Sequence, residues 1–362
     1  MNELDTLPTP ALILDLDVLE RNLDGMARHA DSLGVRLRPH IKTHKCIEVA
    51  ELQRRAGAQG ITVSTLHEAE IFAAHGFDDI TWAFPVILNR LADAAELAGR
   101  IDLGLLIDSE EALDALVSLP RQGTPLRVWL KIDCGYHRAG IDPGSERMLD
   151  IARGVDDAAT LSLAGILTHS GHAYHAYGDE ARRAVAEQER SAMASAAASL
   201  GAAGIEVKEV SVGSTPAMTA ARSLEGVTEA RPGNYAFYDY MQCALGSCDP
   251  SDVAVSVLTS VVSRMPNHSV VDAGALTMSK DPGPEHEAAG MGPVLAEVGS
   301  IDRDMRLLSV SQEHGILNTP LPVGTRLRIM PNHSCLTVAC FDEYRVVRGG
   351  ELVGRWKIHR GR

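Results

Sequence analysis

Hydrophobic and polar positions follow a regular pattern between residues 35 and 231. Short runs rich in Val, Ile and Leu are separated by longer Ala-, Leu- and Glu-rich stretches of helical period. Such repeats are typical of a parallel sheet covered by helices. Strands are predicted at 35–41, 60–64, 79–84, 102–107, 126–133, 161–168, 206–212 and 227–231. Eight strands alternating with helices favour an α/β fold, an eight-stranded β/α barrel of the TIM type.

The remaining hydrophobic pattern predicts a second domain. Helices are predicted at 66–75, 86–98, 109–118 and 179–202, and a further strand and helix at 11–15 and 17–32 precede the repeats. After about residue 250 the pattern changes to β-branched alternation, with a Gly-Gly hairpin signal at 349–350. A chain of 362 residues exceeds the usual size of one core. We therefore expect a barrel domain over 1–250, whose first residues can join the other domain, and a mainly β domain over 251–362.

Composition narrows the class of ligand. The chain is 45% hydrophobic and 23% charged, as in soluble globular proteins, and its formal net charge is −14. This acidic balance argues against a nucleic-acid groove or an anionic membrane surface and favours a small-molecule substrate. The start of the chain does not resemble a signal peptide and no segment reaches membrane-spanning length, so a cytoplasmic location is expected. The six cysteines include no C-x-x-C pair, which argues against a disulfide framework.

One predicted strand carries an unusual set of basic residues. If VRLRPHIKTHK runs as a strand, alternate side chains share one face, and these are Arg36, Arg38, His40, Lys42 and His44. A barrel interior rarely accepts such a face unless an anionic ligand compensates it, and neighbouring cations make a lysine amine more nucleophilic. Lys42 also lies at the end of the strand, where barrel enzymes keep catalytic groups. The alternative is a solvated strand end with ordinary cations.

Polar residues follow several later strands. They are Asp133 and Arg138 in KIDCGYHRAG, His169 and Tyr174 in LTHSGHAY, Ser211 to Thr215 in SVGST, and Arg231 to Tyr235 in RPGNY. A Gly-Ser-Thr turn after a strand can hold a phosphate through backbone N–H groups and hydroxyls. Taken singly, such a turn is more often only a turn, and a Thr-His-Ser sequence more often contains a satisfied core histidine.

The second domain contains a candidate metal pair. His333 and Cys335 in PNHSCLTVAC are two residues apart, so on a strand both side chains point the same way. Nitrogen and sulfur ligands together favour zinc. Two protein ligands leave the ion open to substrate, which suits a catalytic site better than a structural one. The alternative is a chance H-x-C spacing.

Taken together, these segments resemble one family nearly from end to end. It is the family of fold-type III pyridoxal-phosphate enzymes that share the alanine racemase barrel, in its branch of eukaryotic-type D-serine dehydratases and D-threonine aldolases. The similar segments are LPTPALILDLD (7–17), RPHIKTHK (38–45), GITVSTLHEAE (60–70), IDCGYHRAG (132–140), GILTHSGHAY (165–174), SVGSTP (211–216), RPGNYAFYD (231–239), VDAGALTMSKD (271–281), EHG (313–315) and PNHSCLT (331–337).

The resemblance implies a role for each candidate residue. Lys42 is implied to be the Schiff-base lysine of pyridoxal 5'-phosphate. Arg138 is implied to lie by the phenolic oxygen of the cofactor and His169 beside its ring. Arg231 matches the arginine that contacts the pyridine nitrogen in the racemases, a contact for which Tyr174 is the candidate in the dehydratase branch. The residues implied to surround the phosphate are Ser214, Thr215, Gly233 and Asn234.

The metal pair discriminates between reactions. The sequence His333-Ser334-Cys335 is similar to the zinc pair of D-serine dehydratases, whereas the aldolases tend to show His-Cys-Asp. No segment matches the racemase tyrosine of the second domain. The resemblance thus implies a cytoplasmic homodimeric lyase, most simply a D-serine dehydratase that makes pyruvate and ammonia with a divalent metal, zinc before manganese or magnesium. D-threonine aldolase, 3-hydroxy-D-aspartate aldolase or dehydratase, and a non-catalytic cofactor-binding protein are the alternatives.

Overall fold

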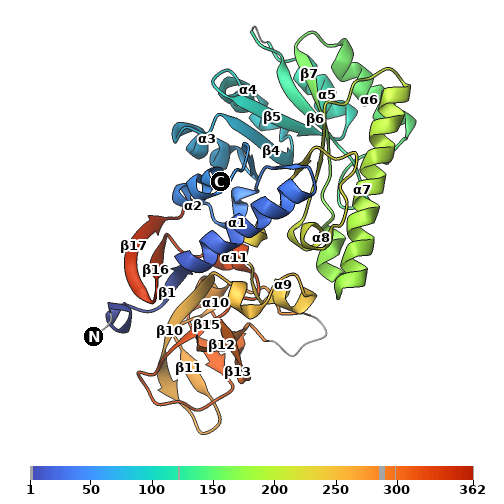
Figure 1. Cartoon of the computed structure of the whole chain (residues 1–362). Coiled ribbons are helices and arrows are strands. Elements are labelled where there is room, and N and C mark those ends of the chain that lie inside the picture. Colours follow the sequence, from blue (N-terminus) through green and yellow to red (C-terminus); the bar gives the residue numbers. More distant parts are fainter. Residues whose placement is uncertain (1–2, 121–122, 285–289, 298, 362) are drawn as a thin grey trace. The chain divides into compact units, whose positions relative to one another are not determined.

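The computed structural model describes residues 3–120, 123–284, 290–297 and 299–361 (Figure 1). The chain divides into two compact units. Unit 1 comprises residues 1–26, 43–52 and 234–360, and unit 2 comprises residues 27–42, 53–233 and 361–362. A short stretch near the start, 43–52, therefore belongs to the same unit as the last third of the chain.

Unit 2 contains a sheet of eight strands in the order β2-β9-β8-β7-β6-β5-β4-β3, and every neighbouring pair is parallel. A parallel bridge between His40 and Thr62 joins the segment after β2 to β3, so the two ends of this order are linked. The predicted eight-stranded β/α barrel is confirmed. The strands are β2 (Arg36–Leu37), β3 (Ile61–Val63), β4 (Asp79–Pro85), β5 (Asp102–Ile107), β6 (Leu126–Lys131), β7 (Leu161–Leu167), β8 (Glu209–Val212) and β9 (Glu229–Ala230).

Helices alternate with these strands, as the hydrophobic period predicts. Polar side chains mark where they begin, because the first backbone N–H groups of a helix need acceptors. Thr65 and Glu68 form a reciprocal capping box at α3, and Ser109 and Ser145 cap α5 and α6. The helices are α1 (Leu16–Ser32), α2 (Ile47–Arg55), α3 (Leu66–Ala74), α4 (Leu91–Leu97), α5 (Glu110–Val117), α6 (Glu146–Asp157), α7 (Asp179–Ala202) and α8 (Thr215–Ala220).

Unit 1 is built on a nine-stranded sheet in the order β11-β14-β13-β12-β15-β10-β1-β16-β17. An additional pairing between β10 and β11 closes the first six of these strands into an antiparallel barrel. The predicted mainly β second domain is confirmed, and the predicted strand 11–15 is its strand β1. The strands are β1 (Ala11–Asp15), β10 (Val255–Arg264), β11 (Ser269–Val271), β12 (Gly292–Glu297), β13 (Ser300–Val310), β14 (Gly315–Leu317), β15 (Arg326–Ile329), β16 (Glu343–Arg348) and β17 (Glu351–Lys357).

Each unit has its own apolar core. One cluster in unit 1 joins β1, β10 and β16 through Leu7, Ala11, Ile13, Leu258 and Val347. One cluster in unit 2 lies between β5, β6 and β7 and comprises Leu106, Trp129, Ala164 and Leu167. In the part of the chain that the structure describes, no helix is long and apolar enough to span a bilayer.

Candidate functional site

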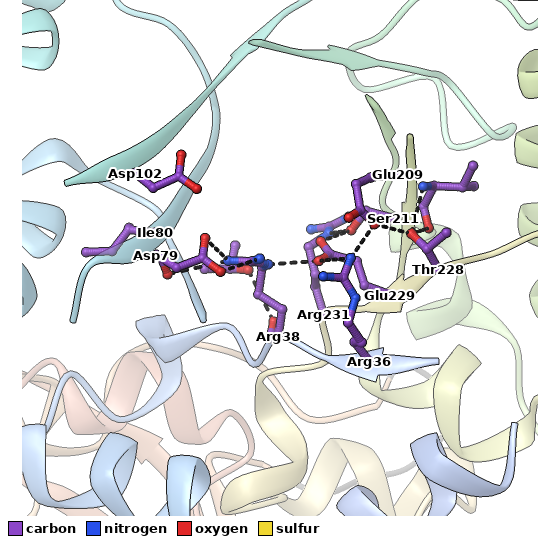
Figure 2. A network of polar contacts seen from close by, with 12 residues as sticks. Arg36, Arg38, Asp79, Ile80, Asp102, Glu209, Ser211, Thr228, Glu229 and Arg231 are labelled. Atoms are coloured by element: carbon purple, nitrogen blue, oxygen red, sulfur yellow. Dashed lines mark hydrogen bonds and ion pairs between the residues drawn. The ribbon is translucent and has the colours of Figure 1, made fainter. Parts of the chain in front are cut away.

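The basic face predicted for the first barrel strand is largely neutralised by carboxylates of the barrel itself (Figure 2). Arg38 is 2% exposed. Its Nε donates to Glu229 at 2.8 Å, and Nη1 and Nη2 donate to the two Asp79 oxygens at 2.8 Å each. Arg36 pairs with Glu209. Burial lowers the pKa of Arg38, but Glu229 and Asp79 together raise this pKa by more than burial lowers it, so the net shift is upward. The expectation that an anionic ligand compensates these two arginines is wrong.

Strand alternation also ends before Lys42. Strand β2 covers only Arg36–Leu37, and residues Ile41–Thr43 form a 3₁₀ turn that carries an exposed Lys42. His44 is fully buried, and its backbone carbonyl accepts a hydrogen bond from the Tyr344 hydroxyl at 2.7 Å. The predicted common face of five basic residues is therefore wrong, because the chain turns after the bridge at His40. Lys42 nevertheless follows the carboxyl end of a barrel strand, as expected.

Cations gather around His169 in unit 2. Nδ1–H of this half-buried histidine donates to the Gly213 carbonyl at 3.1 Å. Burial lowers the pKa of His169, and the positive charges of Lys42, Arg138 and Arg231 lower it further. Burial and the same two arginines lower the pKa of Lys131 to about 8. The structure thus brings Lys42, Arg138, His169 and Arg231 together, and their combined charge suits an anionic ligand.

The Gly-Ser-Thr turn lies at the same side of the barrel. Ser214 caps α8 by accepting from the Ala217 N–H at 3.4 Å, and its hydroxyl lies 3.2 Å from that of Ser170. Gly213 has a φ of +129°, and a Cβ there would lie 2.8 Å from the backbone nitrogen of Arg231. Glycine is required at this close approach. Thr215 begins α8, so the turn presents hydroxyls and glycine backbone next to the cations, which fits a bound phosphate.

Arg231 and Tyr174, the alternatives for the pyridine nitrogen, differ in their surroundings. Arg231 is 4% exposed, its Nε donates to Ser211 Oγ at 2.7 Å, and its Nη2 donates to the Thr168 carbonyl. Burial lowers its pKa to about 10. Tyr174 is half-buried in a 3₁₀ turn, Gly171–His175. The protein thus already engages part of the Arg231 guanidinium, and the contact to the pyridine nitrogen stays a prediction.

Sequence reasoning missed Tyr136. The Arg138 guanidinium lies 5.1 Å from the centre of the Tyr136 ring. The ring also meets His169 edge-on at 6.3 Å and stacks on His172 at 6.0 Å. The sequence feature that reflects this packing is Gly171, because a Cβ at this position would lie 2.1 Å from the Tyr136 ring. Tyr136 thereby holds two of the residues that the resemblance assigns to the cofactor.

In unit 1, the candidate metal pair lies at the start of a short helix. His333 is the residue before α11 (Ser334–Val338), so the strand geometry predicted for the pair is wrong. The first helical turn still brings Cys335 to His333, and Cys335 Sγ lies 3.2 Å from Thr43 Oγ1. Nδ1–H of His333 donates to the Asp281 carboxylate. Burial lowers the pKa of His333, but Cys335 and Asp281 raise it to about 11.

Two further carboxylates support this turn, and sequence reasoning missed both. Asp239 accepts the Ser334 N–H at 2.9 Å and the Asn234 amide at 2.6 Å, whereas Asp281 holds His333. The signal was their position at the ends of RPGNYAFYD and VDAGALTMSKD. The Asn234 amide also donates to Ser334 Oγ at 3.1 Å, so this side chain supports the His333 turn, whereas the resemblance assigns Asn234 to the phosphate.

The donor set of the pair fits a soft divalent metal with open positions. Among the described residues, no group of three or more His, Cys, Asp or Glu side chains could hold an ion. An imidazole and a thiolate are the ligands that zinc prefers, and two protein ligands leave room for water or substrate oxygen. A carboxylate on the second ring nitrogen is the usual companion of a metal-binding histidine.

Comparisons with known proteins match most of the chain to two protein families. Residues 14–241 match the family "Alanine racemase, N-terminal domain" and residues 254–347 match "Putative serine dehydratase domain". A D-threo-3-hydroxyaspartate dehydratase of Delftia sp. (strain HT23) is 42% identical over 98% of both chains. A D-serine dehydratase of Dictyostelium discoideum is 36% identical over 99% of this chain and 98% of the relative. A 3-hydroxy-D-aspartate aldolase of Paracoccus denitrificans is 30% identical over 97% of this chain and 92% of the relative.

Solved structures agree with these relatives. The D-threo-3-hydroxyaspartate dehydratase from Delftia superimposes with a TM-score of 0.95 over 99% of both chains, at 42% identity. Two further structures of that dehydratase have a histidine and a cysteine, two positions apart, replaced by alanine, and the cysteine mutant is in the metal-free form. An alanine racemase from Bacillus anthracis shares the fold, with a TM-score of 0.72 at 17% identity over 97% of this chain and 98% of that one.

Proposed function

The chain belongs to the fold-type III pyridoxal-phosphate enzymes, in the branch of D-serine and 3-hydroxyaspartate dehydratases and their aldolase relatives, and on that premise we propose that it dehydrates a 3-hydroxy D-amino acid. The observation that carries the proposal is the His333 turn. It combines an imidazole, a thiol and an orienting carboxylate in the unit that matches the serine dehydratase domain.

The cationic end of the barrel supports the cofactor assignment. Pyridoxal phosphate, when bound, stabilises the electron pair left at Cα once its proton is removed. Lys42 is the exposed amine that would hold the cofactor covalently, and its amine would act as the general base for that proton. Arg138 and Ser214 offer positive charge and a hydroxyl for the phenolic oxygen and the phosphate, with Thr215 and Gly233 beside them. Burial and its cationic neighbours lower the pKa of His169 and keep it neutral, so it would lie beside the ring without adding charge.

The metal pair supplies the second part of the reaction. His333 would hold the ion through Nε2, because Nδ1–H donates to Asp281, and Cys335 would hold it as a thiolate. Zinc is the ion that this donor set favours over manganese or magnesium. An ion held by this pair would supply Lewis-acid polarisation of the substrate β-hydroxyl, which would make it a better leaving group.

Dehydration is favoured over aldol cleavage by two observations. The dehydratases compared are 42% and 36% identical to this chain, whereas the 3-hydroxy-D-aspartate aldolase is 30% identical. The pair here is His-Ser-Cys, which by the family resemblance is the pattern of the dehydratases, whereas the resemblance gives His-Cys-Asp for the aldolases. D-threo-3-hydroxyaspartate and D-serine are the two substrates that these relatives suggest.

Product analysis tests the proposal. The holoenzyme is incubated with D-threo-3-hydroxyaspartate, D-serine or D-threonine, with and without a chelator. We expect ammonia and a keto acid, oxaloacetate or pyruvate, from one of the first two substrates, and loss of that product after chelation. Glycine and an aldehyde as the main products would show an aldolase. No product from any 3-hydroxy D-amino acid, with cofactor bound, would support a binding protein without catalysis.

The family resemblance also underlies a proposed homodimer in the cytoplasm, with the active site at the subunit interface. Sedimentation equilibrium of the holoenzyme measures the first point. Turnover measured across a dilution series that dissociates the dimer tests the second, because a site shared between subunits is lost in the monomer.

A further inference from the structure

Resting on the proposed cofactor site, we propose that Ser211 and Glu229 are positioning residues, which form a buried relay that holds the Arg231 guanidinium in place beside the cofactor. Figure 2 shows the relay as part of a longer polar network of the barrel. Neither residue touches the atoms that react. Their effect on the cofactor is exerted through Arg231.

Sheet register brings the relay together. Ser211 of β8 and Glu229 of β9 are direct partners in the parallel pairing of these strands. Arg231 follows β9, and its backbone N–H donates to the carbonyl of Val212 at 2.8 Å. The three side chains therefore come from adjacent strands, and their relative positions are set by backbone hydrogen bonds.

Hydrogen-bond chemistry gives the relay a direction. A serine hydroxyl has one proton to donate and lone pairs to accept with. Ser211 Oγ lies 2.6 Å from Glu229 Oε1, an acceptor, and 2.7 Å from Arg231 Nε, a donor. Ser211 must therefore donate to Glu229 and accept from Arg231. Removal of this hydroxyl leaves both neighbours short of a partner.

The three side chains of the relay are buried, so the loss of one of these hydrogen bonds costs more free energy than it would at the surface. Ser211 is 0% exposed, Glu229 is 1% exposed and Arg231 is 4% exposed. In such surroundings an unpaired polar group costs more free energy than it does at a surface, and bonds in a chain strengthen one another. The Arg231 guanidinium donates to Ser211 and to the Thr168 carbonyl, and both of these partners are uncharged. The negative charges of Glu229 and Glu189 also act on this guanidinium, and the Glu229 carboxylate is linked to it by hydrogen bonds through Ser211.

The network connects opposite ends of the barrel strands. Glu229 Oε2 accepts from Arg38, Arg38 is held by Asp79, and Asp79 also accepts from Arg127, which pairs with Asp102 at 3.0 Å. Asp79 and Asp102 begin β4 and β5, whereas Arg231 follows the end of β9. One branch of the network thus leads to the proposed cofactor and the other leads away from it.

This branching provides a matched control. Ser211→Ala removes the hydroxyl, and Glu229→Gln removes the charge while keeping an amide oxygen as acceptor. Asp102→Asn changes the distant branch of the same network, where the side chain is 59% exposed. Each variant is prepared without cofactor and titrated with pyridoxal phosphate, and the visible absorbance of the bound cofactor is recorded against pH. Thermal unfolding of each variant is recorded separately.

We expect Ser211→Ala and Glu229→Gln each to weaken cofactor affinity about tenfold and to shift the pH at which the visible band changes. The double variant is expected to bind the cofactor about as well as the single variant with the lower affinity, because both residues act through one relay. Asp102→Asn is expected to keep the affinity and the pH profile of the unmodified protein.

Unchanged affinity and pH profile in Ser211→Ala would overturn the proposal, as would losses in the double variant that add fully. If Glu229→Gln does not fold, Ser211→Ala decides alone. A lowered unfolding temperature with an unchanged cofactor spectrum means a purely structural role and also overturns the relay. Failure of the proposed function would be recognised separately. If the unmodified protein binds the cofactor but produces glycine and an aldehyde, dehydration is contradicted, whereas the proposed relay is not affected.

Discussion

The Asp281 carboxylate accepts a hydrogen bond from Nδ1–H of His333. This contact fixes the tautomer of the imidazole and leaves Nε2 to bind a metal ion. Asp281 and His333 are 52 residues apart in the sequence, so no local pattern connects them. The orientation of the histidine to which we assign the metal is therefore decided by a residue that comes just after a short helix, α10 (Ala275–Met278).

Asp281→Ala is expected to weaken metal binding by about 10- to 100-fold, the usual effect of removing the partner of a metal-binding histidine. Asp281→Asn, which retains an acceptor oxygen, should lose less. Competition with a chromophoric chelator measures both affinities. Asp302→Ala is the control, because this carboxylate of the same unit accepts backbone N–H groups of Asp304 and Met305. Equal affinity of Asp281→Ala and the unmodified protein would contradict the role of Asp281.

Cys335→Ala is expected to abolish keto-acid production while the visible absorbance of the bound cofactor is retained, because in the proposed site the thiolate holds the metal and not the cofactor. Turnover and absorbance are measured on the same sample. Cys340→Ala is the control, since this thiol lies five residues later and donates to the Leu336 carbonyl at 3.4 Å. Undiminished turnover in Cys335→Ala, or in metal-stripped enzyme, would remove the metal from the reaction.

Lys42→Ala is expected to lower turnover by about a thousandfold or more, because it removes the proposed covalent attachment point and general base. Borohydride reduction followed by peptide mass analysis measures the attachment: the unmodified enzyme should carry the reduced cofactor on the peptide that contains Lys42. Lys45→Ala is the neighbouring control and should be labelled as the unmodified enzyme is. Label on another lysine would refute the assignment.

Lys131 predicts a pH dependence of stability in the protein without cofactor. Burial lowers its pKa to about 8 from an ordinary value of 10.5. Between these values the unfolded chain holds the proton and the folded chain does not, so the free energy of unfolding rises with pH. Across the whole window the gain is about 3 kcal/mol. Urea unfolding at several pH values should show this slope, and Lys131→Met should flatten it and be more stable than the unmodified protein at pH 7. An unchanged slope in Lys131→Met would contradict the assignment.

Gly60→Ala is expected to destabilise unit 2 by about 3 kcal/mol, because it combines backbone strain with a clash. Gly60 has a φ of +68°, and a Cβ there would lie 2.1 Å from Arg38 Nη1. Gly34→Ala is the matched control, with a φ of +71° and nothing within 4 Å of its Cβ. We expect this control to lose only about 1 kcal/mol, the cost of the strained backbone. Equal losses in urea unfolding would show that the clash with Arg38 is relieved.

The periodicity of the sequence by itself determined the barrel strands, several of the helices between them and the β character of the last third of the chain. All eight predicted barrel strands are present, with ends that differ by a few residues, and the predicted helix at 179–202 is α7. This succeeds because a strand or helix that buries one face must repeat apolar residues at its own period, which is a local property of the chain. The candidate residues at strand ends were found for the same reason, since parallel strands end at one edge of the sheet.

Only the tertiary structure decided what each of these side chains meets. The sequence pattern indicated that Arg36 and Arg38 belong to a basic face that needs an anionic ligand. In the structure, Glu229 and Asp79, which lie far along the chain, neutralise Arg38. His333 and Cys335 are joined by a helical turn where alternation indicated a strand, and Asp281 completes them. A buried charge must find a partner, but any carboxylate that folding brings within reach can serve, so the spacing of residues does not specify which one it is.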